Sequence, residues 1–342
     1  MTDLTGRKLG QYEITAWLGR GGMADVYRAV QPSIGREVAV KILPREFLHD
    51  PAFLERFNRE VRIIANLKHP RVLPVYDFGE QDGLPFIVMA YMEGGSLADL
   101  IRQAPGGMDI EEVVRLTGQI AEGLDYAHRR GIIHRDFKPS NVLLDEEGNI
   151  YLGDFGIAKA IESTAQLTGS GIVGTPLYMA PEMAQPGGVT PLVDVYALGV
   201  AVYQMLTGRA PYEADTPIGL LMAHAVNPIP NVRALRPGLP EAVQRVIEQA
   251  MAKDPAQRYQ SAGGLAAGLR SAVAGAQPAP APLPVVLPAG EPAPGGPAAL
   301  PEALPSLPPD PEVTYAEAQA VPPAGPAPVS YTHLTLPTIY SV

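Results

Sequence analysis

Four side chains of this sequence could together carry out chemistry on a phosphate ester: Asp136, Lys138, Asn141 and Asp154. They lie in two strings, His-Arg-Asp-Phe-Lys-Pro-Ser-Asn and Gly-Asp-Phe-Gly, which are separated by a hairpin-like pair of strands. Transfer of the γ-phosphoryl group of ATP needs a carboxylate that orients the attacking hydroxyl, and oxygen ligands for the magnesium ion that neutralises the developing charge. Asp136 suits the first task, and Asn141 and Asp154 suit the second.

The two strings resemble the catalytic loop H-R-D-x-K-x-x-N and the metal motif D-F-G of the eukaryotic-type protein kinase family, here His134–Asn141 and Asp154–Gly156. Phe137 replaces the usual leucine and keeps its apolar character. The resemblance implies an α+β, bilobal protein-kinase fold, with a small β-rich N-lobe that includes helix αC and a larger helical C-lobe. It also implies ATP as the phosphoryl donor, Mg2+ or Mn2+ as the metal, and a catalytic role for Asp136 and Lys138. Either string alone can arise by chance or as a turn, so the interpretation depends on further motifs in the family order.

The composition changes along the chain of 342 residues. A hydrophobic content of 46% is enough for a substantial core, but from about Ser271 onward the chain is rich in Pro, Ala and Gly and contains no Lys or Arg. Such a segment cannot bury enough apolar surface to offset the loss of chain entropy. We therefore expect a Pro/Ala-rich disordered linker at residues 271–328. In the chain before it, the family resemblance implies a kinase N-lobe at residues 9–94 and a C-lobe at 95–270.

Charge and cysteine content exclude several classes of protein. Five of the 36 acidic residues lie after Ser271, which leaves 31 acidic against 26 basic residues, a net charge of −5, for the rest of the chain. The sequence has no stripe of basic residues that would indicate binding to nucleic acid. The absence of cysteine excludes disulfides, thiolate catalysis and cysteine-based zinc sites, and it is consistent with a reducing compartment. Because we find neither a secretory signal nor an apolar run of roughly 18 residues, we expect a cytoplasmic kinase domain.

A glycine-rich stretch near the N-terminus could cradle phosphates. Tyr12–Leu18 alternates like a strand, and Gly-Arg-Gly-Gly-Met-Ala-Asp-Val leads into a second strand. Glycines let backbone N–H groups approach a polyphosphate closely, although a tight hairpin would use them too. Ala24 occupies the third glycine position of the family pattern G-x-G-x-x-G. By resemblance, five residues of this loop and its neighbouring strands contact the nucleotide: Leu18, Gly19, Gly21, Val26 and Ala39.

Two charged residues could form the ion pair that holds ATP in the family. Lys41 lies in Glu-Val-Ala-Val-Lys-Ile, a β-branched run that matches the family's V-A-I-K strand. Glu60 lies in a helix that the apolar periodicity predicts between Pro51 and Leu67. By resemblance, Lys41 contacts the α- and β-phosphates and pairs with Glu60. The alternative interpretation of Lys41 is a surface lysine at the end of a strand. The charged neighbours of Glu60 are expected to face water: Glu55, Arg56, Arg59 and Arg62.

Two further strands, expected at Val72–Phe78 and Pro85–Tyr91, lead to the family's hinge. By resemblance, Met89 is the gatekeeper, and the backbones of Ala90 and Met92 hydrogen-bond adenine. Because these are backbone roles, side-chain identity says little, and both methionines could be ordinary core residues.

An amphipathic helix expected at Ile110–Arg130 delivers the chain to the catalytic loop. By resemblance, His134 supports this loop and the metal motif. Arg135, beside the catalytic aspartate, is typical of kinases whose activation loop is ordered by a phosphate that pairs with this arginine. Thr168 and Ser170 are the hydroxyls nearest to the family's usual phosphosite. We expect autophosphorylation of one of them to raise activity.

Residues 174–182, Gly-Thr-Pro-Leu-Tyr-Met-Ala-Pro-Glu, resemble the serine/threonine-kinase string G-T-x-x-Y-x-A-P-E. The resemblance implies that Thr175 bonds the catalytic aspartate and lysine, and that the acceptor is a serine or threonine of a protein. It also implies a buried ion pair between Glu182 and Arg258, the arginine of Lys-Asp-Pro-Ala-Gln-Arg. Asp194 could merely cap a helix, but in the family this aspartate holds the catalytic-loop backbone.

Residues 329–342 differ in composition from the Pro/Ala-rich segment before them. Codons for Val329–Thr338 can be written GTC TCT TAT ACA CAT CTG ACG CTG CCG ACG, which matches the adapter of transposase-based sequencing libraries. We therefore expect residues 329–342 to be non-native read-through, which the nucleotide sequence would decide. In that case a longer parent chain could carry a transmembrane helix and an external sensor domain, as many bacterial relatives do, and be a single-pass membrane protein.

The expected function is that of a bacterial eukaryotic-like (Hanks-type) serine/threonine protein kinase that uses ATP, phosphorylates protein acceptors and itself, and could form a homodimer. The resemblance extends over about Leu9–Leu269, and Gly-Gly-Met-Ala and Phe-Asn-Arg-Glu are closest to bacterial members. A pseudokinase is one alternative, which the full set of catalytic residues disfavours. A small-molecule phosphotransferase of the same fold is another, which the string at residues 174–182 disfavours.

Overall fold

The computed structural model describes residues 3–21, 24–45, 53–155, 176–184 and 187–275. The chain divides into two units, Met1–Ala281 and Pro282–Val342, and all described residues belong to the first unit. The predicted phosphosites Thr168 and Ser170 lie outside the described residues, and so does Thr175. Of the segments expected to be linker (271–328) and read-through (329–342), only residues 271–275 are among the described residues.

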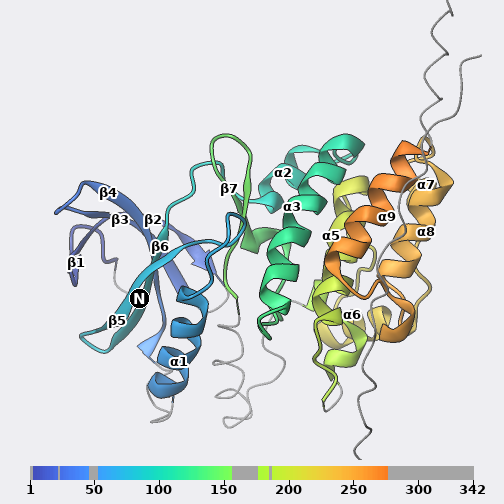
Figure 1. Ribbon diagram of the computed structural model, residues 1–342. Coiled ribbons are helices and arrows are strands. Elements are labelled where there is room, and N and C mark those ends of the chain that lie inside the picture. Colours follow the sequence, from blue (N-terminus) through green and yellow to red (C-terminus); the bar gives the residue numbers. More distant parts are fainter. Residues whose placement is uncertain (1–2, 22–23, 46–52, 156–175, 185–186, 276–342) are drawn as a thin grey trace, which may run out of the picture. The chain divides into compact units, whose positions relative to one another are not determined.

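An antiparallel sheet occupies most of the described chain before residue 91 (Figure 1), in the strand order β1-β2-β3-β4-β6-β5. Its strands are β1 (Lys8–Leu9), β2 (Tyr12–Gly21), β3 (Ala24–Gln31), β4 (Arg36–Ile42), β5 (Val75–Gln81) and β6 (Leu84–Ala90). Because side chains alternate along a strand, Ile87 and Met89 of β6 join one hydrophobic cluster, whereas Phe86 and Val88 join another. Strand β6 is therefore buried along its whole length.

Strand β5 begins later than the sequence predicts. The expected strand started at Val72, but Val72 forms only an isolated bridge with Leu152. Pro74 has no backbone N–H to donate to a ladder, which explains why regular pairing starts after it. Asp82 and Gly83 then connect β5 to β6 with φ angles of 54° and 71°, as a tight two-residue turn between twisted strands requires.

Helix α1 (Phe53–Ala65) packs beside this sheet (Figure 1). Phe53, Phe57, Val61 and Ile64 recur at the helical period and are buried. A backbone hydrogen bond connects the sheet and α1 to the helical part of the chain. The Leu73 N–H donates to the Leu152 carbonyl at 2.9 Å, so the chain that leaves α1 is bonded directly to the strand before the metal motif.

The helices that follow are α2 (Leu97–Gln103), α3 (Ile110–His128), α5 (Leu192–Thr207), α6 (Pro217–Val226), α7 (Val232–Leu235), α8 (Glu241–Ala250) and α9 (Ala262–Ala274). Shorter elements join them: η2 (Pro139–Asn141), β7 (Val142–Leu144), β8 (Ile150–Leu152), η3 (Pro176–Tyr178), η4 (Pro181–Ala184) and η5 (Pro255–Gln257), where η denotes 3-10 helix. Helix α9 continues past residue 270, the expected end of the C-lobe. Within the described ranges, no helix is both long and apolar enough to cross a membrane.

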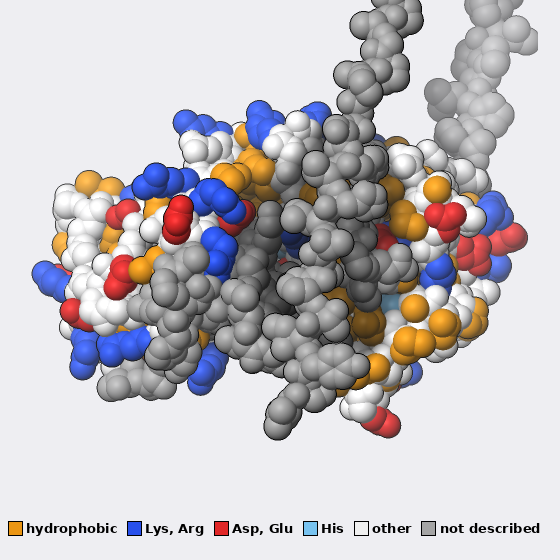
Figure 2. Space-filling model, turned by 90° about the horizontal axis from the view of Figure 1, so that it is seen from below, with side chains coloured by type: hydrophobic (Ala, Val, Ile, Leu, Met, Phe, Trp, Pro, Cys, Tyr) orange, Lys and Arg blue, Asp and Glu red, His pale blue; other side chains and the backbone are white. Residues whose placement is uncertain are grey.

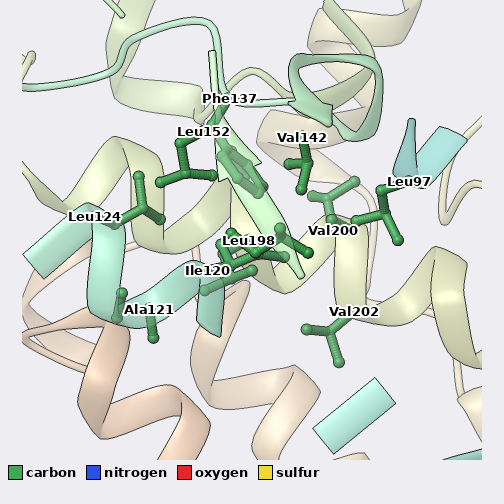
Figure 3. Close-up of a cluster of buried hydrophobic side chains, with 14 of the residues drawn as sticks. Leu97, Ile120, Ala121, Leu124, Phe137, Val142, Leu152, Leu198, Val200 and Val202 are labelled. Carbon is green, nitrogen blue, oxygen red and sulfur yellow. The ribbon is translucent and has the colours of Figure 1, made fainter. Parts of the chain in front are cut away.

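Helix α5 is the centre of the helical part. Nearly all of its residues are buried, and it packs against α3, α8 and α9. A helix that is covered on all sides has no polar face, which explains its almost continuous apolar sequence. Figure 3 shows Phe137 of the catalytic loop in one hydrophobic cluster with Leu152 and Leu198. At 2% exposure, this phenylalanine anchors the catalytic loop in the core, as an apolar residue at this position should.

Candidate active site

The backbone of the catalytic loop is held by Asp194 of helix α5. One carboxylate oxygen accepts the N–H of His134 at 2.8 Å, and the other accepts the N–H of Arg135 at 2.9 Å. His128 Nε2 lies 2.7 Å from the same carboxylate. Asp194 is 1% exposed, so these contacts satisfy a buried polar group. The alternative interpretation of Asp194 as a helix cap is wrong, because α5 begins earlier, at Leu192.

Two residues of the site adopt left-handed backbone conformations. The φ angle is 66° at Arg135 and 59° at Asp154. Non-glycine residues in this region cost on the order of 1 kcal/mol or more, and they persist where the surrounding structure fixes them. The bond from its N–H to Asp194 fixes Arg135. Strain of this kind concentrates at functional sites.

His134 connects the catalytic loop to the metal motif. It is fully buried, and its Nε2 lies 2.9 Å from the carbonyl oxygen of Gly153. Its ring packs against Phe155 with a centroid distance of 4.5 Å, and it meets Phe137 edge-on. The side chain therefore has no access to a reacting group, and its contacts are those of a scaffold.

Asp136 lies at the centre of a small hydrogen-bonded group. Lys138 Nζ is 2.7 Å from Asp136 Oδ2. Asn141 Nδ2 donates to the Asp136 carbonyl at 2.8 Å and to its carboxylate at 3.2 Å. The Asp136 side chain remains 32% exposed. A carboxylate that is fixed by two donors and still open to solvent can accept a proton from an incoming hydroxyl.

Lys41 pairs with Asp154 and not with Glu60. Lys41 Nζ lies 2.8 Å from Asp154 Oδ1, an ion pair between strand β4 and the metal motif. The Glu60 carboxylate lies 3.5 Å from the Arg59 guanidinium, and no ion pair between described residues joins it to Lys41. The ion pair expected from the family resemblance is thus absent from this conformation. Both side chains are largely buried, so Glu60 lies on the inner side of α1 without making that contact.

Asp154 stays ionised in this environment. Burial raises the pKa of its carboxyl group, but the charge and the hydrogen bond of Lys41 lower it, with smaller contributions from His134 and Lys138. The balance leaves the pKa below its usual value. An ionised carboxylate is the form that binds a hard cation.

Asp154 and Asn141 form a donor set that fits Mg2+. Their side chains provide oxygen atoms, and Asn141 directs its amide nitrogen to Asp136, which leaves its side-chain oxygen for a cation. The described residues contain no cluster of three or more His, Cys, Asp or Glu that could hold a metal alone. Mg2+ does not need one, since it is usually bound by one or two carboxylates together with substrate phosphates.

The register of the sheet gathers the residues predicted to contact the nucleotide. Val26 pairs with Gly19 on one side and with Lys41 on the other, and Ala39 pairs with Met89. The Ala90 N–H already donates to the Pro74 carbonyl at 3.0 Å, so this N–H is not free to donate to adenine. Leu18 and Gly21 lie on β2, the strand that pairs with β3. Met92, which is half-buried, follows the end of β6.

Glu182 and Arg258 form the buried ion pair that the sequence predicts. The pair is bidentate, with Arg258 Nη1 and Nη2 lying 2.6 and 2.8 Å from the two carboxylate oxygens. Glu182 is 7% and Arg258 2% exposed. The guanidinium also donates to the carbonyls of Ala252, Leu192 and Lys253, which completes its hydrogen bonding. Such a pair locks η4 onto the helical part.

A second buried polar cluster lies around His224 of helix α6 and was not found from the sequence. His224 is fully buried, its Nδ1 lies 2.8 Å from Tyr196 Oη, and its carbonyl accepts a hydrogen bond from Lys253 Nζ at 2.5 Å. Burial, followed by the charge of Lys253, lowers the pKa of His224 to about 4. The only sequence signal is a histidine within the apolar run Leu-Leu-Met-Ala-His-Ala-Val.

The neutral state of His224 predicts an acid sensitivity. Its pKa is about 4 in the folded chain against 6.5 unfolded, so between these values the unfolded chain binds a proton that the folded chain does not. This contribution to stability is complete above pH 6.5 and is lost as pH falls toward 4. Between pH 7 and pH 4.5 the free energy of unfolding should fall by roughly 2 kcal/mol through this residue. Urea unfolding at both pH values should show a smaller fall for His224→Asn, and an equal fall would contradict the assignment.

Comparison with known proteins agrees with this geometry. The protein kinase domain family matches residues 12–267. The chain is 38% identical over 270 residues to the serine/threonine-protein kinase PrkC of Bacillus subtilis, which covers 79% of this chain and 42% of PrkC. It is 43% identical over 262 residues to the serine/threonine-protein kinase PknH of Mycobacterium tuberculosis, with coverage of 76% and 42%. The chain therefore spans less than half the length of these two relatives.

Solved structures show the same fold. The crystal structure of the M. tuberculosis PknI kinase domain is similar with a TM-score of 0.66 at 31% identity, covering 79% of this chain and 98% of that domain. Together with the family match over most of the chain, these similarities show that the chain belongs to the protein kinase domain family and to its bacterial serine/threonine, or Hanks-type, branch.

Proposed function

We propose that this chain transfers the γ-phosphoryl group of ATP to serine or threonine hydroxyls of proteins. The observation that carries the proposal is the arrangement around Asp136, whose partly exposed carboxylate is bonded to Lys138 and Asn141. The Gly153 N–H donates to the Asn141 carbonyl at 2.8 Å, which joins this group to the metal motif and its ion pair with Lys41. A proton acceptor, two cations and two metal ligands are thus linked in one site.

The proposed reaction follows from these positions. The acceptor hydroxyl oxygen forms a bond to the γ-phosphorus, the bond from this phosphorus to the β–γ bridging oxygen breaks, and ADP leaves. The hydroxyl proton passes to the Asp136 carboxylate. Lys138, at 2.7 Å from that carboxylate, orients it and offers positive charge to the transferred group. When Mg2+ is bound by Asn141 and Asp154, it neutralises charge on the phosphates.

The segment 176–184 supports a protein acceptor over a small molecule. The Tyr178 hydroxyl donates to Gln204 of α5 at 2.5 Å, and Glu182 is locked to Arg258. A segment that is fixed in this way and is still partly exposed suits a peptide acceptor, whereas a small acceptor would need an enclosed pocket. Both curated relatives described above are serine/threonine-protein kinases by name. We propose protein serines and threonines as the acceptors for these reasons.

A transfer assay tests the proposed function. The purified chain, labelled ATP, Mg2+ and dephosphorylated casein should yield phosphoserine or phosphothreonine on casein, and Asp136→Asn should form this product about 1,000-fold more slowly. ATP binding without transfer by the wild type would favour the pseudokinase. Label on a small molecule but on neither casein nor the chain itself would favour a small-molecule phosphotransferase.

We also propose that phosphate on Thr168 or Ser170 activates the chain through Arg135. A phosphate carries nearly two negative charges and would pair with this arginine, whose backbone is already fixed beside the catalytic aspartate. The Thr168→Ala/Ser170→Ala double variant should lose activity about tenfold, or about 1.4 kcal/mol, which is the size of one charge-assisted hydrogen bond. Phosphopeptide mapping of active wild-type protein checks the sites, and active protein with neither residue phosphorylated would contradict the proposal.

A further inference from the structure

Helix α6 buries a histidine and leaves three of its large apolar side chains exposed. Ile218, Met222 and Val226 are 66%, 53% and 67% exposed, whereas the buried residues are Ala223 and His224. Figure 2 shows hydrophobic side chains on the surface of the helical part, on the side where Figure 1 places α6. Leu220 and Ala223 pack against the hydrophobic core, and the polar contacts of His224 provide a second attachment of this helix.

Those contacts surround His224. Its ring meets the rings of Tyr196 and Tyr212 edge-on, with centroid distances of 5.7 and 4.8 Å. Lys253 Nζ, which bonds the His224 carbonyl, also donates to Tyr212 Oη at 3.0 Å. The group therefore ties α6 to α5, to the chain that leaves α5 and to the chain after α8. A buried polar group of this kind has a defined geometry, because each unmade bond would cost its desolvation energy.

The same group lies directly behind the segment 176–184. Helix α6 packs against both η3 and η4. The Nε2 of His224 is buried and has no hydrogen-bond partner among the described residues, and the backbone of Leu177 in η3 is near enough to raise the pKa of the ring against the larger effect of burial. The Arg258 guanidinium, which holds Glu182 of η4, lies 4.8 Å from the centroid of the Tyr196 ring. Displacement of His224 or Tyr196 would therefore disturb both η3 and η4.

We propose that His224 and Tyr196 are positioning residues for the protein acceptor: their hydrogen bond fixes α6 behind the segment 176–184 and thereby sets the affinity for the acceptor. Neither residue touches the site of ATP or the group around Asp136. The inference rests on the proposed function, in which this segment binds the acceptor.

Steady-state kinetics of the full chain with ATP, Mg2+ and dephosphorylated casein separate acceptor binding from chemistry. His224→Ala and Tyr196→Phe should each raise the KM for casein about tenfold, which corresponds to about 1.4 kcal/mol. The KM for ATP and kcat should stay within twofold of the wild type. His224→Asn keeps a polar atom near the position of Nδ1 and should recover most of the loss. The double variant should be no worse than either single variant, because both remove the same bond.

Two controls separate positioning from general destabilisation. Tyr196→Phe removes a single oxygen atom, so it still tests the proposal if His224→Ala fails to fold. Val113 of α3 is buried in the same helical part and makes none of these contacts. Val113→Ala creates a cavity there, and this variant should leave the KM for casein unchanged. An unchanged KM in Tyr196→Phe, or an equal rise in Val113→Ala, would overturn the inference and leave the proposed function intact. Failure of the wild type to phosphorylate any protein would overturn both.

Discussion

Replacing Asp136 with asparagine is expected to lower kcat about 1,000-fold while leaving the KM for ATP within about threefold of the wild type. An amide of the same shape can keep the contacts with Lys138 and Asn141, but it cannot accept the proton of the acceptor hydroxyl. A proton acceptor of this kind typically contributes a factor of 10² to 10⁴ in rate. Binding of ATP does not depend on that proton, so its KM should change little.

The matched control is the same chemical change at an exposed turn. Asp82 has a left-handed backbone with φ of 54°, a conformation that asparagine adopts as readily as aspartate. Asp82→Asn should therefore retain full activity and stability. Initial rates of labelled phosphate transfer to casein, measured at saturating ATP, compare the three proteins. Equal rates for Asp136→Asn and the wild type would remove Asp136 from the proposed reaction.

Lys41→Met tests the other half of the site in the same assay. Its removal leaves the Asp154 carboxylate without the cation that lowers its pKa, and it removes positive charge from the expected position of the phosphates. We expect both a weaker affinity for ATP and a lower kcat. The fluorescence of Trp17, the sole tryptophan of the chain, offers a measure of nucleotide binding because Trp17 lies on β2 next to Leu18.

Much of this site could be predicted from the sequence because its residues lie in short strings with fixed internal spacing. Asp136, Lys138 and Asn141 fall within one loop, so their mutual contacts follow from local geometry. The pair between Glu182 and Arg258 joins distant positions, but two recognisable strings specify it. The fold class followed from the family that these strings resemble, and the hydrophobic periodicity predicted individual helices such as α3.

What the sequence could not predict depends on how elements sit against each other. Lys41 pairs with Asp154 and not with Glu60, and this pairing depends on how strand β4, α1 and the metal motif are placed in space, which no local pattern contains. The polar contacts of His224 in α6 could not be predicted for a similar reason. His224 meets Tyr196 and Lys253 only because three separate helical segments converge, and a single histidine in an apolar run carries no indication of its partners.

Removing only one member of the Glu182–Arg258 pair is expected to lower the free energy of unfolding by roughly 3 to 5 kcal/mol. The pair is nearly inaccessible to water, so Arg258→Met would leave the Glu182 carboxylate buried and without its partner. The loss of attraction is only part of this cost, because the stranded charge also keeps its full desolvation penalty. Such a loss is a large fraction of the stability of an ordinary domain.

The exposed pair of Arg245 and Glu241 on α8 is the matched control, since it has the same charges at 2.9 Å but side chains that are 65% and 73% exposed. Arg245→Met should cost less than about 1 kcal/mol, because water screens both groups and solvates the remaining carboxylate. The same substitution thus gives a large loss at position 258 and a small one at 245. Equal losses in urea unfolding would show that burial does not control the cost.

The Glu182→Leu/Arg258→Met double variant separates the energy of the pair from the cost of a stranded charge. With both charges removed, nothing ionised remains buried, and the two apolar side chains can pack in the same space. We therefore expect the double variant to be more stable than either single variant, and the loss to be far smaller than the sum of the two single losses. Additive losses would mean that Glu182 and Arg258 stabilise the protein independently, which their two short hydrogen bonds argue against. Recovered stability without recovered kinase activity would show that the pair also orients η4. An apolar contact can fill the same space, but it lacks the directionality of two parallel hydrogen bonds.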